Sequence, residues 1–122
     1  MADAAGPGLS HLRVSLGGEF YVGPGRADLL ELIQSTGSIS EAARRMGMSY
    51  KRAWQLVQAV NSGFGVPLVE AVRGGREQGA VLTATGREVL ERYRGMQEAT
   101  RRAIARDVEA LCRLQGDMSG EK

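Results

Sequence analysis

The feature that most constrains the fold is a pair of helix-start signals set close together in the middle of the chain. Ser38 and Glu41 have the spacing of a capping box, in which a serine and a glutamate three residues later satisfy free amides at a helix start. Gly47 stands where a left-handed cap ends that helix, and Ser49 is a second N-cap soon after it. Two helices joined by so short a turn cannot lie antiparallel, so the segment predicts a helix-turn-helix unit.

Hydrophobic repeats define the helices of this region. An earlier helix is predicted over residues 26–35, where leucines and an isoleucine form one apolar stripe. The two closely spaced helices are predicted over residues 40–46 and 50–61, and each has apolar side chains every three or four positions. Three short helices in succession therefore form the centre of the predicted domain.

Two short β elements flank these helices. Alternating apolar and polar residues on both sides of Gly17 and Gly18 predict a hairpin, because glycine reaches the positive φ angles of a tight turn. Residues 68–72 and 80–82 are predicted to be strands around a polar, glycine-rich loop. A strand pair directly after a helix-turn-helix unit is typical of a wing.

A long last helix, predicted over residues 86–114 and capped by Thr83 or Thr85, follows the wing. The predicted fold is mainly α with small β: a winged helix-turn-helix with an N-terminal hairpin and a long C-terminal dimerisation helix. The expected division is residues 1–22 for an arm and the hairpin, 23–86 for the winged helix-turn-helix domain, 87–116 for the long helix and 117–122 for a polar tail.

Positive charge is concentrated in one stretch of a nearly neutral chain. Residues 42–87 carry seven basic and two acidic side chains, a net charge of +5, and because the whole chain carries +2 the remainder sums to −3. No acidic residue stands between positions 42 and 69. A surface that faces nucleic-acid phosphates needs such a concentration of cations.

The composition excludes several other classes of protein. With 43% hydrophobic and 25% charged residues, the chain is predicted to be globular rather than disordered. It has no apolar run long enough to span a membrane and no secretory signal, so we expect a cytoplasmic protein. One cysteine and one histidine provide neither a zinc site nor a Cys–His nucleophile pair, and we expect no enzymatic activity.

Three sequence segments carry a family resemblance. They are GSISEAA at residues 37–43, MSYKRAW at 48–54 and GAVLT at 79–83. From residue 12 to 94 the chain resembles the N-terminal DNA-binding domain of the ModE-type molybdate-responsive regulators, and it is similar, more distantly, to the LysR-type winged helix. The resemblance implies a transcriptional regulator whose partner is a double-stranded DNA operator.

The same resemblance bears on cofactors. In the ModE family a molybdate-binding module follows the DNA-binding domain, and this chain stops where that module would begin. We therefore expect a free-standing DNA-binding domain without a cofactor. Direct binding of molybdate stays an open alternative, for which the sequence identifies no site.

A helical wheel separates two faces of the helix predicted over residues 50–61. Its core face is formed by Ala53, Leu56, Val57 and Val60, and Lys51, Gln55 and Gln58 point nearly opposite. Because a helix in the major groove reads base edges near its N-terminus, Lys51 and Arg52 are predicted to contact guanine or phosphate, and Gln55 adenine. Ser49 is predicted to serve both as cap and as phosphate ligand.

Other side chains have weaker assignments. Trp54 is expected more as a half-buried wedge against the first helix than as a DNA contact, and the hydroxyl of Tyr50 could reach a phosphate. Arg44 and Arg45 are predicted to pair with phosphates, and the wing arginines with the minor groove or the backbone. The full predicted set is Arg44, Arg45, Ser49, Tyr50, Lys51, Arg52, Trp54, Gln55, Gln58, Arg73 and Arg76.

The last helix has more apolar positions than an isolated surface helix needs, which predicts a homodimer through this helix, with the N-terminal hairpins as a second contact. Two recognition helices would then meet half-sites one helical turn, or a multiple of it, apart on a near-palindromic operator.

The alternative function is that of a winged helix that docks on a protein partner. The basic stretch around Lys51 argues against it, since protein-docking faces are depleted in lysine.

Overall fold

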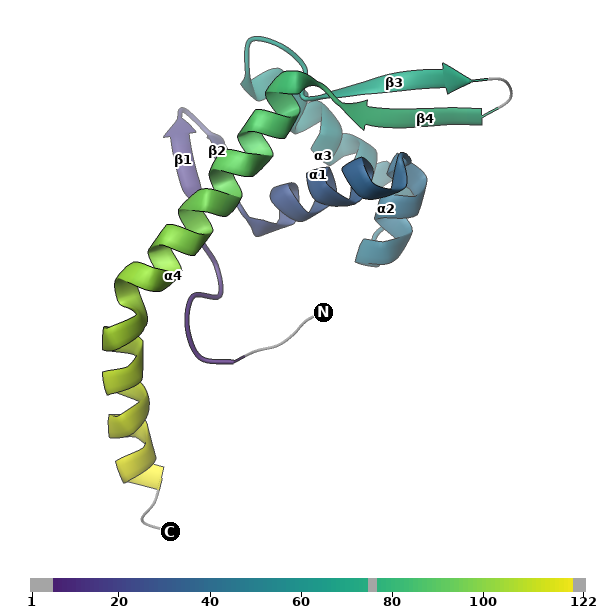
Figure 1. Ribbon diagram of the computed structural model, residues 1–122. Helices are drawn as coiled ribbons and strands as arrows, with labels where there is room; N and C mark the ends of the chain where they lie inside the picture. Colours follow the sequence, from purple (N-terminus) through teal and green to yellow (C-terminus); the bar gives the residue numbers. More distant parts are fainter. Residues whose placement is uncertain (1–5, 75–76, 120–122) are drawn as a thin grey trace.

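The computed structural model describes residues 6–74 and 77–119 (Figure 1). The elements in chain order are β1 (Val14–Gly17), β2 (Phe20–Val22), α1 (Pro24–Thr36), α2 (Ile39–Met46), α3 (Tyr50–Gly63), β3 (Val69–Gly74), β4 (Glu77–Leu82) and α4 (Ala84–Ser119). This order confirms the predicted hairpin, helix-turn-helix, wing and long last helix.

The helix-turn-helix forms where the two caps were predicted. Ser38 accepts a hydrogen bond from the amide of Glu41 at 3.0 Å, and Ser49 accepts one from the amide of Arg52 at 3.1 Å. Gly47 ends α2 with φ +70°, a conformation that favours glycine because it has no Cβ. Local hydrogen bonds alone therefore fix where α2 ends and α3 begins.

The reciprocal half of the predicted capping box is not formed. The amide of Ser38 donates to the hydroxyl of Thr36 at 3.2 Å instead of to the glutamate. The carboxylate of Glu41 turns along the helix toward Arg44 and Arg45, whose charges attract it more strongly than a neutral amide does.

Several helices are longer than predicted. Pro24 occupies the first turn of α1, where its fixed φ suits a helix start, so the helix begins two residues early. α4 begins at Ala84, and the hydroxyl of Thr83 accepts a hydrogen bond from the amide of Gly86 at 3.0 Å, which identifies Thr83 as the cap. The same helix continues to Ser119, five residues beyond the predicted end.

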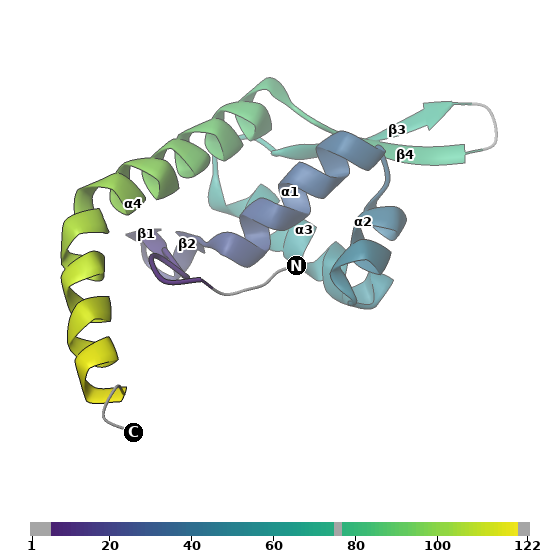
Figure 2. The same cartoon turned by 60° about the horizontal axis from the view of Figure 1, so that its bottom comes forward.

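Both β elements are antiparallel pairs. β1 pairs with β2 across the turn at Gly17 and Gly18, which have φ values of +110° and +57°. β3 pairs with β4 in a register that runs from Val69↔Leu82 to Gly74↔Glu77, so the wing strands are longer than predicted. The wing and the distal half of α4 project from opposite sides of the fold (Figures 1 and 2).

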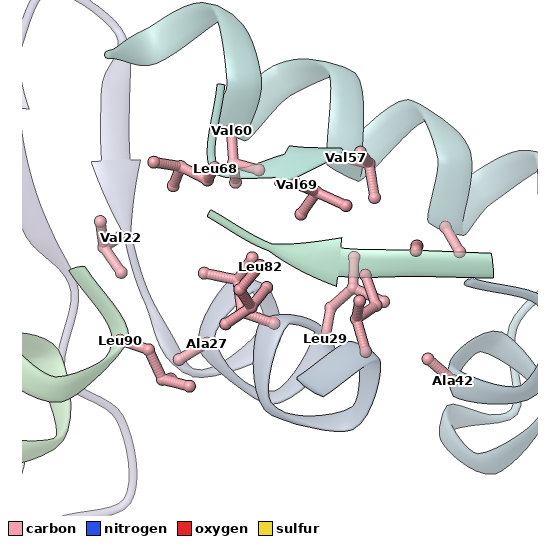
Figure 3. Packing of buried hydrophobic residues seen from close by; sticks show 14 of the residues in the cluster. Val22, Ala27, Leu29, Ala42, Val57, Val60, Leu68, Val69, Leu82 and Leu90 are labelled. Carbon is pink, nitrogen blue, oxygen red and sulfur yellow. The ribbon is translucent and has the colours of Figure 1, made fainter. Parts of the chain in front are cut away.

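The hydrophobic core fills the space between α1, α3, the wing strands and the start of α4. Figure 3 shows β4 lying between α3, which contributes Val57 and Val60, and α1, which contributes Ala27 and Leu29. Leu82 of β4 packs in the same cluster. This packing holds α3 by one side only and leaves its other side at the surface.

The two halves of α4 differ in how they are held. In the first half, the hydroxyl of buried Tyr93 donates to the carbonyl of Leu12 at 2.7 Å, and Arg94 pairs with Asp28 and Glu31 of α1 at 2.8 and 2.6 Å. Beyond Gln97 the helix leaves the fold and changes direction (Figures 1 and 2). In the described part of the chain, no helix combines the length and the apolar character needed to cross a membrane.

Candidate nucleic-acid interface

The outer face of α3 carries the side chains that the wheel placed there. Ala53 and Val57 are buried on the core side, whereas Lys51, Gln55 and Gln58 are exposed on the opposite side. The helix is therefore a rod anchored by its apolar side, with a cation and two amides free to contact another molecule. Leu56 is only partly buried and packs at the margin of the core.

The N-terminus of α3 adds unsatisfied donors to this face. Ser49 caps the helix, and Tyr50 and Arg52 in its first turn are both exposed. Among the residues that the structure describes, no carboxylate lies within ion-pair distance of Lys51 or Arg52. The positive end of the helix dipole and two unpaired cations therefore point away from the core together.

The two arginines of α2 are exposed but are not free. Arg44 contacts the Glu41 carboxylate through Nε at 3.1 Å and through a second, closer contact from Nη2, and Arg45 Nε donates to the same carboxylate at 3.1 Å. Hydrogen bonds from Arg44 and then Arg45 lower the pKa of Glu41 from 4.5 to about 2. Any phosphate that reaches these arginines must compete with this carboxylate, an obstacle that the predictions from sequence did not include.

The wing is tied to the helix-turn-helix on both of its strands. Asn61, near the end of α3, accepts hydrogen bonds from the amides of Leu68 and Val69 at 2.8 and 3.0 Å and donates to the carbonyl of Val69 at 3.1 Å. On the other strand, the amide of Ala80 donates to the carbonyl of Gly37 at 2.9 Å. Asn61 was not among the predicted site residues, although a polar residue on the core flank of the wheel is a signal that could have found it.

The predicted wing contacts are only partly described. Arg73 lies near the end of β3 and is exposed. Arg76 lies outside the described residues. The structure therefore describes one of the two predicted wing cations, which is exposed near the far end of a strand that Asn61 holds at its start.

Trp54 lies beside the wing. Its indole is 46% exposed and lines a groove of about 660 Å³ between the start of α2, α3 and the wing, and no residue of α1 lines that groove. Position 54 lies one turn after Tyr50 and two turns before Asn61, so the three residues share one flank of α3. Asn61 is hydrogen-bonded to β3, which makes this flank the wing side. The indole is half-buried, and a contact with the first helix stays a prediction.

Comparisons with known proteins bear on the same segment. The family described as bacterial regulatory helix-turn-helix protein, lysR family, matches residues 26–87, half of the chain. The DNA-binding domain in a structure titled as a CbnR_DBD–DNA complex has a TM-score of 0.57 and 29% identity, and the match covers 71% of this chain and 95% of that one.

Curated relatives match a longer stretch. The molybdenum-pterin-binding protein MopB of Rhodobacter capsulatus is 41% identical over 85 residues, which are 69% of this chain and 32% of that protein. The DNA-binding transcriptional dual regulator ModE of Escherichia coli (strain K12) is 34% identical over 103 residues, 82% of this chain and 39% of that protein. The chain thus spans about a third of the length of the curated relatives it matches.

The family match begins in α1, includes both helices of the turn and the whole wing, and ends in the first residues of α4. These are the elements whose packing exposes the outer face of α3. The chain belongs to the LysR family of bacterial regulatory helix-turn-helix proteins.

Proposed function

We propose that this chain binds double-stranded DNA in a sequence-specific way and regulates transcription as a homodimer, with α3 in the major groove. The observation that carries the proposal is the exposed face of Lys51, Gln55 and Gln58 on a helix whose other side is buried. An α-helix fits the major groove, and an amide side chain can form a paired contact with adenine. The face therefore carries groups that distinguish base pairs.

Contacts to the DNA backbone would orient this helix. Lys51 and Arg52 have no carboxylate partner among the described residues, and Ser49 places the helix N-terminus beside them. Arg73 on the wing would extend the contact to a neighbouring groove or strand. Arg44 and Arg45 would contribute less than their number suggests, because Glu41 holds both.

The homodimer is proposed from the distal half of α4. Leu111 and Leu114 are 64% and 61% exposed on a helix that has left the fold, and Ile104 and Val108 precede them at helical spacing. Exposed leucines at such spacing on two copies would bury each other in a helix pair. A two-fold dimer would present two α3 helices to half-sites on a near-palindromic operator.

Molybdenum enters through the resemblance to the ModE family and through the names of relatives, which are about three times as long as the matched segment. We propose that this segment binds its operator without molybdate. Repeating the binding measurement below with and without added sodium molybdate tests this part.

Selection of bound duplexes from a random library by the full chain tests the function. The wild-type protein should recover a two-fold-related motif, and Gln55→Ala should relax base preference at one position in each half-site because one paired contact is lost. Gln34→Ala, the same substitution at an exposed position of α1, is the matched control and should leave the motif unchanged. Recovery of no motif by the wild type would contradict the proposal and favour docking on a protein partner.

A further inference from the structure

We infer that Trp54 determines specificity by contacting the 5-methyl group of a thymine in the major groove, in each half-site of the bound DNA. This inference rests on the proposed DNA binding and adds a second kind of base reading to it. The amide and cation on the outer face of α3 would read hydrogen-bonding groups, whereas the indole would read an apolar one.

The first support is the position and exposure of two aromatic rings. Trp54 is 46% exposed and Tyr50 is 54% exposed, and they lie one helical turn apart on the wing side of α3. Both are close in sequence to Lys51 and Gln55, on the N-terminal half of the helix, which is the half that reaches base edges in a major groove. A large aromatic side chain left this exposed gains free energy when an apolar group covers it.

The second support is the chemistry of the groove that the rings line. Its described walls carry no charged side chain; they are formed by Ser38, Ile39, Ser40, Tyr50, Trp54, Val57, Gln58, Asn61, Val69, Ala71, Gly79 and Ala80. A phosphate would find no cation there, although Lys51 and Arg52 stand unpaired just outside. The thymine methyl is the one apolar group that the edges of base pairs present in the major groove, so it complements this surface best.

The third support is that the groove is fixed before any ligand arrives. Hydrogen bonds from the side chain of Asn61 join α3 to the backbone at the start of β3. A hydrogen bond from the amide of Ala80 to the carbonyl of Gly37 joins β4 to the start of the helix-turn-helix. A side chain at position 79 would place its Cβ 3.0 Å from the carbonyl of Gly37, so glycine there permits this close approach. Because both walls are held, little ordering entropy opposes the contact.

The test uses the tightest duplex recovered by the selection described above. Each thymine of one half-site is replaced in turn by deoxyuridine, which removes only the methyl group, and the dissociation constant is measured by fluorescence anisotropy at fixed salt. For the wild-type chain, one replacement should weaken binding about fourfold, the value expected for one buried methyl group. For Trp54→Ala, that same replacement should have no further effect.

Two further measurements separate base reading from a structural role. Trp54→Phe keeps an apolar ring and should retain most of the sensitivity to deoxyuridine. The salt dependence of binding by Trp54→Ala should equal that of the wild type, since an uncharged contact releases no counterions. Circular dichroism of each variant checks that the domain is folded.

The outcomes are distinguishable from failure of the proposed function. If the wild-type chain binds no duplex at low ionic strength, the DNA-binding proposal itself is wrong. If the wild type binds and no deoxyuridine replacement weakens it, or if Trp54→Ala keeps the wild-type sensitivity at every thymine, the inference about Trp54 is wrong while DNA binding stands.

Discussion

α3 and the distal half of α4 both leave large side chains at the surface, but they expose different chemistry. On α3 the exposed aromatic rings of Tyr50 and Trp54 stand beside cations and amides, and Lys51 and Arg52 have no carboxylate partner among the described residues. On distal α4 the exposed large groups include leucines, while Arg101 and Arg102 are paired with Glu98 at 3.6 and 3.3 Å. A face of cations and amides suits a polyanion, and a stripe of exposed leucines suits a second protein surface.

The comparison also shows that exposure alone does not indicate a partner. The same helix, α4, is part of the domain core through Tyr93 and becomes a projecting arm about a turn later. What separates the two halves is what lies against the apolar stripe: Tyr93 packs within the core, whereas Ile104 and Val108 line a hollow together with residues 7–9. The following predictions test each side of this contrast, and they begin with the largest effect.

Leu111→Glu should dissociate the proposed dimer. Each copy would place a charge where a leucine was to be buried, and the loss of two buried leucines weakens association by about 3–6 kcal/mol. Sedimentation equilibrium should then show monomers at micromolar concentration. Arg113→Glu introduces the same side chain on another face of the helix and should leave the dimer intact; dissociation by both variants would contradict the assignment of the face.

Tyr93→Ala should destabilise the domain itself. Tyr93 is fully buried, and its hydroxyl donates a hydrogen bond to the carbonyl of Leu12. Truncation of a buried aromatic side chain lowers the free energy of unfolding by about 3–5 kcal/mol. Urea denaturation gives the free energy of unfolding directly. Tyr93→Phe removes only the hydrogen bond and should cost about 1 kcal/mol. Equal and negligible losses in the two variants would mean that proximal α4 is not part of the core.

Glu41→Gln should strengthen DNA binding about two- to fivefold, the range that one exposed charge pair can supply. The substitution frees Arg44 and Arg45 for phosphates and removes a charge that repels them. Glu88→Gln, which breaks the exposed pair with Arg92 on α4, is the control and should have no effect. Anisotropy titrations that show weaker binding for Glu41→Gln would indicate that α2 does not face DNA.

The smallest effect concerns pH. Because the pKa of Glu41 falls from 4.5 to about 2 on folding, its contribution to stability is complete above pH 4.5 and is lost as the pH falls toward 2. The pairing with Arg44 and Arg45 should therefore be the same at pH 8 and pH 5. An NMR titration of the carboxyl carbon should give a midpoint near 2, and a midpoint near 4.5 would contradict the paired geometry.

Most of the fold could be predicted because its signals are local. Ser38, Gly47 and Ser49 each act through hydrogen bonds or φ angles within a few residues, so the helix-turn-helix follows from short-range chemistry. The end of α4 could not be predicted in the same way. Gly116 lies inside the helix rather than after it. Where no capping residue marks the end of a helix, its last residue cannot be located from the sequence to better than one or two positions.

The candidate site was predictable only in part, because some of its roles depend on contacts between elements. The wheel separates Lys51 and Gln55 from the core, since periodicity alone decides which side is buried. It cannot show that Trp54 faces the wing, that Asn61 bonds to β3, or that Glu41 turns toward two arginines rather than the cap. Those facts require the positions of neighbouring elements in space.

The salt dependence of DNA binding tests the central claim about α3 most directly. Anisotropy titrations of the full chain with its selected duplex should give an affinity that falls steeply with salt concentration. Lys51→Ala should reduce the slope of log affinity against log salt by about one for each recognition helix, and Arg92→Ala on α4 should leave it unchanged. An equal slope for wild type and Lys51→Ala, or no binding at low salt, would contradict the placement of α3 in the duplex.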